Sequence, residues 1–114
     1  VAILLAFTLV PTLALAQTET GKIPGTVTDQ SGAVLPGAAV TVKNLGTQAV
    51  RNAATDAHGN FTFAALTPGP YEVTAELTGF SKKAIKTTLR VGATVMIDAR
   101  LEVGALTDVV EVFV

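Results

Sequence analysis

Apolar and polar residues alternate along most of the chain after residue 17. In the clearest run, Tyr71–Thr78, the odd-numbered residues are apolar and the even-numbered ones are polar. Thr94–Leu101 places Val, Ile, Ala and Leu at its odd positions, and shorter runs cover Val40–Lys43, Phe61–Phe63 and Ile85–Val91. A period of two residues puts neighbouring side chains on opposite faces of an extended chain. The pattern therefore predicts strands with one buried face.

Turn-forming residues separate these runs. They lie at 29–32 (DQSG), 44–46 (NLG), 56–60 (DAHGN), 68–70 (PGP), 78–79 (TG) and 91–92 (VG). The predicted strands are 22–29, 38–44, 49–55, 60–64, 70–78, 81–91 and 94–102, with a last extended piece at 107–113. Short strands separated by such turns are typical of an antiparallel β-sandwich. We expect an all-β domain.

Composition excludes several classes of protein. The length of 114 residues suits one domain with a core of moderate size. The net charge of -1, from 8 Lys and Arg against 9 Asp and Glu, provides no basic surface for nucleic acid. The chain has no Cys, which removes disulfides, thiolate nucleophiles and thiolate metal sites.

Residues 1–16 (VAILLAFTLVPTLALA) carry no charge. A membrane-spanning helix needs about 20 apolar residues, and this run is shorter and contains Pro11. It ends in a small-x-small pattern, Ala14-Leu15-Ala16, of the kind that signal peptidase reads. We expect a signal-peptide helix cleaved between Ala16 and Gln17, whose charged n-region lies upstream of Val1, and then a linker at 17–21. An uncleaved anchor and a buried segment are the alternatives.

Several short motifs between residues 22 and 102 together suggest a family. They are Ile23-x-Gly25-x-Val27-x-Asp29, Ser31-Gly32, Leu35-Pro36-Gly37-Ala38-x-Val40-x-Val42, Thr55-Asp56-x-x-Gly59-x-Phe61-x-Phe63, Leu66-x-Pro68-Gly69-x-Tyr71-x-Val73 and Gly79-Phe80. This set resembles the carboxypeptidase regulatory-like domain. The resemblance implies a seven-stranded, transthyretin-like Greek-key sandwich over 22–102, similar to the accessory module of carboxypeptidases and not to their zinc domain. The collagen-adhesin B-type repeat has a related shape.

The motif residues are also explained by structure alone. A glycine within a strand, Gly25, indicates close approach of a neighbouring segment. Pro36 and Gly37 suit a turn, and Gly59 suits a left-handed conformation. Asp56 is placed to accept backbone N–H groups two or three residues further along. The large apolar members are expected in the core, and they are Phe61, Phe63, Leu66, Tyr71 and Phe80.

His58 is the only histidine and invites a chemical interpretation. Asp56, His58 and Asn60 lie within five residues, but the rest of an EF-hand loop is missing. Ser31 and Ser81 are the only serines, and neither lies in a nucleophile-elbow motif. We therefore expect a plain turn, no catalytic residues, no cofactor and no metal, with a weak calcium or transition-metal site as the alternative.

Other surface chemistry is also limited. An adhesin-type isopeptide needs a buried Lys. Lys43 alternates with the apolar Val40 and Val42, so it is expected on the outer face of its strand. Sugar-binding faces usually need exposed aromatic rings. The chain has no Trp, and Tyr71 falls on the face of its strand that is expected to be buried. One basic cluster, Lys82, Lys83, Lys86 and Arg90, is expected on a solvated strand face. A contact for an acidic polymer or lipopolysaccharide is the alternative for this cluster.

The tail at 103–114 carries the sharpest functional hypothesis. Leu101–Val112 is similar to the segment that follows this domain in Oar-like TonB-dependent outer-membrane receptors, where a plug and a β-barrel come next. Within it, Thr107–Val112 resembles a TonB box, a short strand that pairs with the periplasmic energy-transducing protein TonB. The residues that would bind this partner are Asp108, Val109, Val110, Glu111 and Val112. The segment is followed by Phe113-Val114 instead of the Thr-Ala common in the family, and a simple terminal strand is the alternative.

The resemblance thus implies a non-catalytic binding or positioning module at the N-terminus of an outer-membrane receptor. Its place would be the outer membrane and periplasm of a Gram-negative bacterium, with a barrel in the full-length protein. The alternative is a secreted or surface-attached adhesion or carbohydrate-binding module, for which the partner would be a glycan. Likeness of fold alone does not decide between the two.

Overall fold

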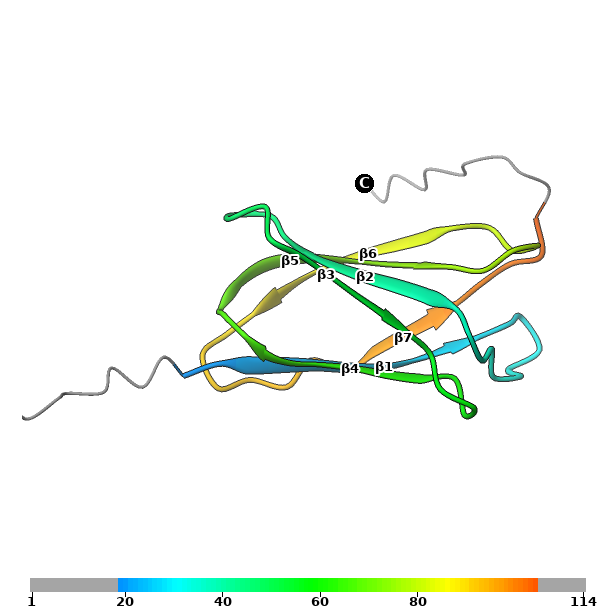
Figure 1. The fold of residues 1–114 in the computed structure, drawn as a ribbon, viewed down its shortest axis with the longest axis horizontal. Helices are drawn as coiled ribbons and strands as arrows, with labels where there is room; N and C mark the ends of the chain where they lie inside the picture. Colours follow the sequence, from blue (N-terminus) through cyan, green and yellow to red (C-terminus); the bar gives the residue numbers. More distant parts are fainter. Residues whose placement is uncertain (1–18, 105–114) are drawn as a thin grey trace, which may run out of the picture.

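The computed structural model describes residues 19–104, which form seven strands (Figure 1). The strands are β1 (Gly21–Thr28), β2 (Ala39–Asn44), β3 (Val50–Ala54), β4 (Asn60–Leu66), β5 (Gly69–Glu76), β6 (Lys83–Leu89) and β7 (Ile97–Arg100). The predicted signal peptide and the extended piece at 107–113 lie outside the described residues. Between residues 19 and 104 nothing helical has the length and apolarity needed to cross a membrane.

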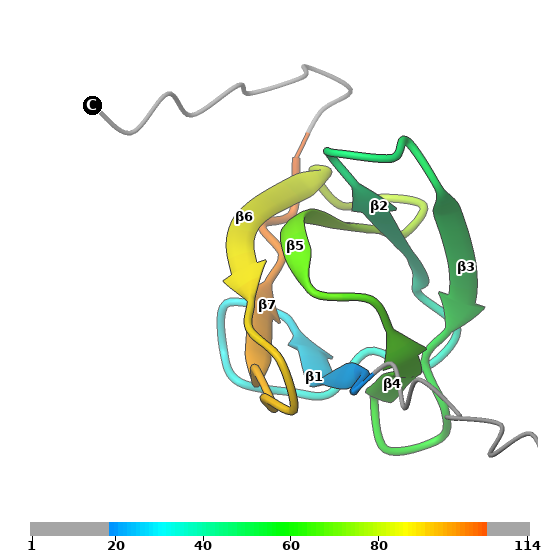
Figure 2. The same ribbon diagram turned by 90° about the vertical axis from the view of Figure 1, so that its left-hand side faces the viewer.

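The strands form two sheets that pack face to face (Figures 1 and 2). One sheet has the order β4-β1-β7 and the other the order β3-β2-β5-β6. The predicted all-β sandwich is confirmed. One pairing differs from the expected antiparallel arrangement, since β1 and β7 run parallel. The chain reaches β7 from β6, which lies in the opposite sheet. No hairpin therefore joins β7 to β1, and the two strands are free to run parallel.

A proline in β1 explains why β7 begins at Ile97 and not at the predicted residue 94. Lys22 donates its N–H to the Ala93 carbonyl at 3.0 Å, and its carbonyl accepts the Val95 N–H at 3.1 Å. Two residues after Lys22, Pro24 lies on the same side of β1 and has no N–H to donate. The proline therefore interrupts the ladder of hydrogen bonds to the segment before β7. Regular pairing with β7 resumes only at Gly25.

Alternate residues of the strands fill the space between the sheets. The buried apolar residues are Ile23, Val27, Ala38, Val40, Val42, Phe61, Phe63, Leu66, Tyr71, Val73, Ala75, Leu89, Ile97, Ala99 and Leu101. The faces predicted from the alternation are therefore largely confirmed, and each large side chain contributes about 1.5–3 kcal/mol. Phe80 is half-buried against this core. Val91 was expected inside and is 60% exposed, because β6 ends at Leu89 and the chain turns at Gly92.

Gly25 lies in β1, the middle strand of the three-stranded sheet, and is tightly packed against both neighbouring strands. A Cβ atom at this position would collide with the ring of Phe61 and with the carbonyl oxygen of Ile97. The glycine thus lets the Phe61 ring lie directly on β1 while β7 pairs alongside. The close approach predicted for this motif glycine is confirmed.

Candidate functional site

The turn between β3 and β4 is built around the carboxylate of Asp56. Its Oδ1 accepts the backbone N–H groups of His58 at 2.8 Å and Asn60 at 3.0 Å. Gly59 adopts a φ of 72° and donates its N–H to the Asp56 carbonyl at 3.0 Å. The predicted turn is confirmed, although the second bond reaches four residues along and not two or three. The carboxylate is therefore engaged in holding the hairpin closed.

A similar turn follows β1, where Asp29 Oδ1 accepts the Ser31 hydroxyl at 2.6 Å and the Ser31 N–H at 2.8 Å. The hydrogen bond from the Ser31 hydroxyl is the main cause that lowers the pKa of Asp29. The pKa of Asp56 is lowered mainly by the N–H of Asn60, then by the N–H of His58. For both carboxylates the accepted hydrogen bonds, and not burial, set the direction of the shift in pKa.

These two turns predict a pH dependence of stability. Because the folded pKa lies below the usual 3.8, the bonds stabilise the fold above that pH and are lost as the pH falls through the lower folded pKa. We expect the free energy of unfolding to fall between about pH 5 and pH 2. Urea denaturation of the double variant Asp29→Asn/Asp56→Asn, which keeps the acceptor oxygens, should show a flatter profile. An unchanged slope in that variant would contradict the assignment.

The other residues considered for catalysis or metal binding are not brought together. His58 is exposed at the tip of its turn, and the Ser31 hydroxyl is bound to Asp29 within its own turn. In the part of the chain that the structure describes, no group of three or more His, Cys, Asp or Glu side chains is placed to hold a metal ion. These positions are accounted for by turn formation.

The basic cluster lies along and beside β6. Lys83 and Lys86 belong to the strand, Lys82 and Arg90 flank it, and all four are exposed. On the outer face of the sheet, Glu72 of β5 is directly opposite Lys86 on one side and Lys43 of β2 on the other. A row of alternating charge favours the expected solvated face over a uniformly basic one.

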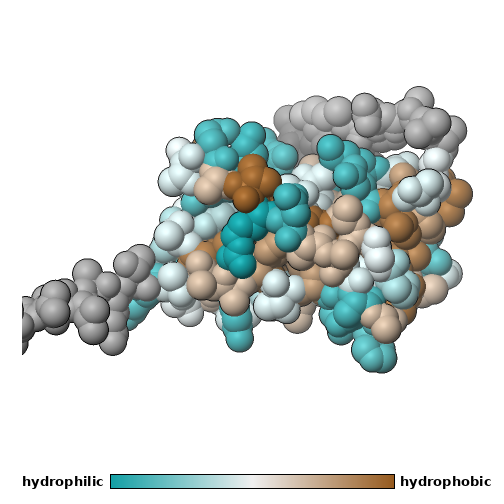
Figure 3. Space-filling view, viewed as in Figure 1, coloured by the Kyte–Doolittle hydropathy of each residue, from teal (hydrophilic) through white to brown (hydrophobic). Residues whose placement is uncertain are grey.

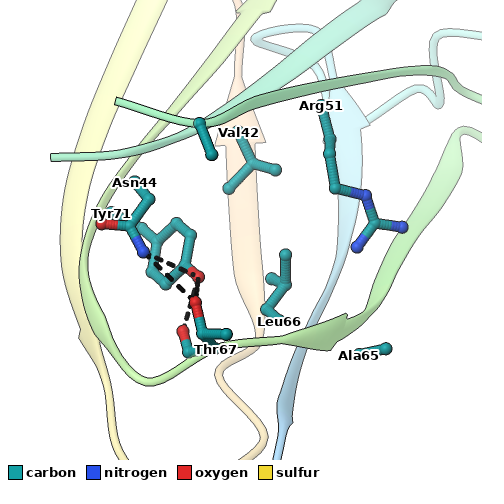
Figure 4. A pocket seen from close by; sticks show the side chains of 8 residues that line it. Val42, Asn44, Arg51, Ala65, Leu66, Thr67 and Tyr71 are labelled. Carbon is teal, nitrogen blue, oxygen red and sulfur yellow. Dashed lines mark hydrogen bonds between the residues drawn. The ribbon is translucent and has the colours of Figure 1, made fainter. Parts of the chain in front are cut away.

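A polar network inside the sandwich was not predicted. Asn44 is 4% exposed, and its Nδ2 donates to the Tyr71 hydroxyl at 3.2 Å. Its Oδ1 accepts the N–H groups of Gly46 at 2.9 Å and Thr47 at 3.0 Å. The Tyr71 hydroxyl in turn donates to the carbonyl of Thr67. The network joins the β2–β3 turn to the β4–β5 connection and fixes the Tyr71 ring (Figure 4).

Beside this network the two sheets leave a hollow of about 130 Å³ (Figure 4). It is lined by Val42, Asn44, Ala49, Arg51, Ala65, Leu66, Thr67 and Tyr71. Sequence reasoning did not identify it. The one available signal was the position of Arg51 in its strand. Arg51 lies opposite the buried Val42 and is therefore on the inner face of β3.

The expected partner-binding residues, Asp108, Val109, Val110, Glu111 and Val112, lie outside the described residues, as does the Ala16–Gln17 cleavage site. The structure does show where the chain approaches them. Val103 pairs with Phe80, and the Ser81 N–H donates to the Glu102 carbonyl at 2.7 Å. The chain is thus attached to the β5–β6 connection up to residue 103.

The fold is a two-sheet β-sandwich, and its motif residues serve in turns, in close packing and in the core. Residues 22–102 match the model of the carboxypeptidase regulatory-like domain. The chain belongs to this family, which confirms the resemblance and describes a regulatory domain, not a catalytic one. A comparison with curated proteins finds no match.

This chain shares its fold with solved structures of widely different proteins. The Bacillus anthracis TIE protein is 22% identical with a TM-score of 0.64, over 74% of this chain and 16% of that one. Acinetobacter radioresistens catechol 1,2-dioxygenase is 14% identical with a TM-score of 0.61, over 79% and 54%. A Bacteroides uniformis protein named as a carbohydrate-binding candidate is 19% identical with a TM-score of 0.57, over 72% and 41%. The chain spans little more than half of these proteins at most, and the likeness concerns the fold alone.

Proposed function

We propose that the chain is a non-catalytic binding and positioning module at the N-terminal end of a TonB-dependent outer-membrane receptor-like protein. In this proposal the sandwich holds Thr107–Val112 in the periplasm, where TonB binds it. The observation that carries the proposal is the order of features in one chain. A carboxypeptidase regulatory-like sandwich ends at an attached Val103, and an acidic segment with alternating Val begins four residues later.

The chemistry of the segment suits strand addition. Backbone hydrogen bonds supply most of the affinity when an extended peptide joins a sheet edge, and alternate side chains supply selectivity. Val110 and Val112 share one face of an extended Thr107–Val112, and Glu111 projects from the other. The attachment of residues 102 and 103 to the β5–β6 connection fixes where the segment leaves the sandwich. Only Gly104, Ala105 and Leu106 separate the two.

The apolar run at 1–16 agrees with this setting, since a receptor of this kind must be exported. Its absence of charge and its small-x-small end suit a cleaved signal. The proposed place of the module is therefore the periplasmic side of the outer membrane.

Pull-down with the periplasmic domain of TonB tests the proposal. In an added strand the N–H groups of neighbouring residues point to opposite sides, so only one of Val109 and Val110 donates to the partner. Proline lacks this donor. We expect either Val109→Pro or Val110→Pro to reduce binding by about tenfold or more, with Ala105→Pro as the control outside the segment. Equal binding by the wild type and both valine variants would reject the proposal.

A surface adhesion or carbohydrate-binding module is the second candidate. Its support is the likeness to the Bacteroides uniformis protein named as a carbohydrate-binding candidate. Stacking on sugars needs exposed rings, whereas Phe61, Phe63 and Tyr71 are at most 4% exposed. Among the described residues this leaves the half-buried Phe80 as the one partly accessible ring. Retention on immobilised glycans together with failure to bind TonB would favour this candidate over the first.

A further inference from the structure

The hollow lies at the open side of the sandwich, between the edge strands β3 and β4 (Figure 4). These strands belong to different sheets, so no ladder of hydrogen bonds closes the gap between them. Val42 and Leu66 form facing apolar walls, and the Tyr71 network closes one end. The hollow is therefore a small, mostly apolar space with defined walls. On the face of the molecule shown in Figure 3, hydrophobic residues are interspersed with polar ones.

The positively charged side chain of Arg51 lies at the other end of the hollow. Arg51 donates from Nη1 to the carbonyl of Ala64 on β4, and its guanidinium lies 5.8 Å from the centre of the Phe63 ring. These contacts keep the side chain across the opening between the sheets. A guanidinium has five N–H donors, and this bond uses one of them. Arg51 is exposed to solvent, and none of the lining residues is acidic, so none of them pairs with its charge.

The backbone beside Arg51 is unusual. Gly21 pairs with Leu66 and Ile23 with Phe63, so β4 has one extra residue in this interval and forms a bulge. Within it, Ala65 has a φ of 55°, a left-handed conformation that alanine rarely adopts. Bulges occur often next to binding sites, and strained backbone tends to cluster at ligand-binding positions. Here the strained residue itself lines the hollow.

We propose that this hollow is a binding site for a small carboxylate with a branched apolar body. The carboxylate would take the free N–H donors of Arg51, as planar guanidinium groups readily bind this anion. The apolar body would lie between Val42 and Leu66. A cavity of about 150 Å³ holds benzene, so a hollow of about 130 Å³ fits a body of about five carbon atoms. This site is independent of the segment proposed to bind TonB.

Tyrosine fluorescence of the purified protein tests the site directly. Tyr71 is the only Tyr, the chain has no Trp, and the ring lines the hollow. Titration with 4-methylpentanoate should give a saturable change in emission. Acetate lacks the apolar body, and 4-methylpentan-1-ol lacks the charge, so each should bind at least about tenfold more weakly. Equal responses to all three compounds, or no saturable response to 4-methylpentanoate, would overturn the proposal.

Variants separate the site from general effects of charge. Arg51→Gln should weaken binding of 4-methylpentanoate by about tenfold or more, and Arg51→Lys should retain part of it. Arg90→Gln removes the same charge from an exposed position outside the hollow and should bind as the wild type does. Equal affinities of Arg51→Gln and Arg90→Gln would contradict the assignment.

A second variant keeps the test decisive if loss of Arg51 unfolds the protein. Ala49 lines the hollow at the β2–β3 turn, and its methyl side chain makes no hydrogen bond that a substitution would break. Ala49→Leu should occupy part of the space and weaken binding while Arg51 is unchanged. Circular dichroism would verify that each variant is folded. An unaltered affinity in a folded Ala49→Leu protein would show that the ligand lies elsewhere.

Discussion

Replacement of Gly25 by alanine is expected to lower the free energy of unfolding by about 3 kcal/mol. The added methyl group would overlap the Phe61 ring on one side and the Ile97 carbonyl oxygen on the other. The ring has some freedom to turn, but the carbonyl belongs to the backbone of β7, whose pairing with β1 holds it in place. Urea denaturation followed by far-ultraviolet circular dichroism measures the loss.

Gly32→Ala is the matched control for this variant. Gly32 has a φ of 88°, and a Cβ there would meet no atom within 4 Å. Its cost is therefore backbone strain without crowding, about 1–2 kcal/mol. If Gly25→Ala proved no more costly than Gly32→Ala, the tight packing of β1 against Phe61 and β7 would be refuted.

Truncation of Tyr71 to alanine is the second change with a large expected effect. The ring is 3% exposed and packs within the core, and removal of a buried aromatic side chain costs about 3–5 kcal/mol. The truncation also leaves the Asn44 amide without its partner hydroxyl. Circular dichroism is the appropriate probe, because this variant loses the only tyrosine.

Tyr71→Phe separates the ring from the hydroxyl. The phenylalanine keeps the packing and removes the bonds to Asn44 and Thr67, so the expected loss is about 0.5–1.5 kcal/mol. The difference between the two variants measures the ring. A Tyr71→Phe variant as unstable as Tyr71→Ala would mean that the network, and not core packing, dominates at this position.

The fold was largely predictable because its determinants are local. The alternation in Tyr71–Thr78 and the Asp- and Gly-bearing turn at 56–60 act over a few residues, and both were confirmed. The ends of strands were less predictable. β7 begins later than predicted because of Pro24, a residue about 70 positions away that lies beside it only in the fold.

The hollow was beyond reach of sequence reasoning for a related reason. It exists because two edge strands from different sheets face each other and because β4 contains a bulge at Ala65. Neither feature leaves a periodic signal, and alanine is not a residue expected at positive φ. Arg51 alone gave a local sign, through its inward parity. The TonB-binding role of 107–112 and the export signal at 1–16 stay predictions.

In the proposed function TonB binds the segment after the sandwich, and the turns have a structural role. An amide nuclear magnetic resonance titration with the periplasmic domain of TonB tests this residue by residue. We expect the resonances of Asp108–Val112 to shift progressively, while those of the turn at Asp56–Asn60 stay where they are. Shifts confined to that turn, or no shift in Asp108–Val112 at saturating TonB, would contradict the account.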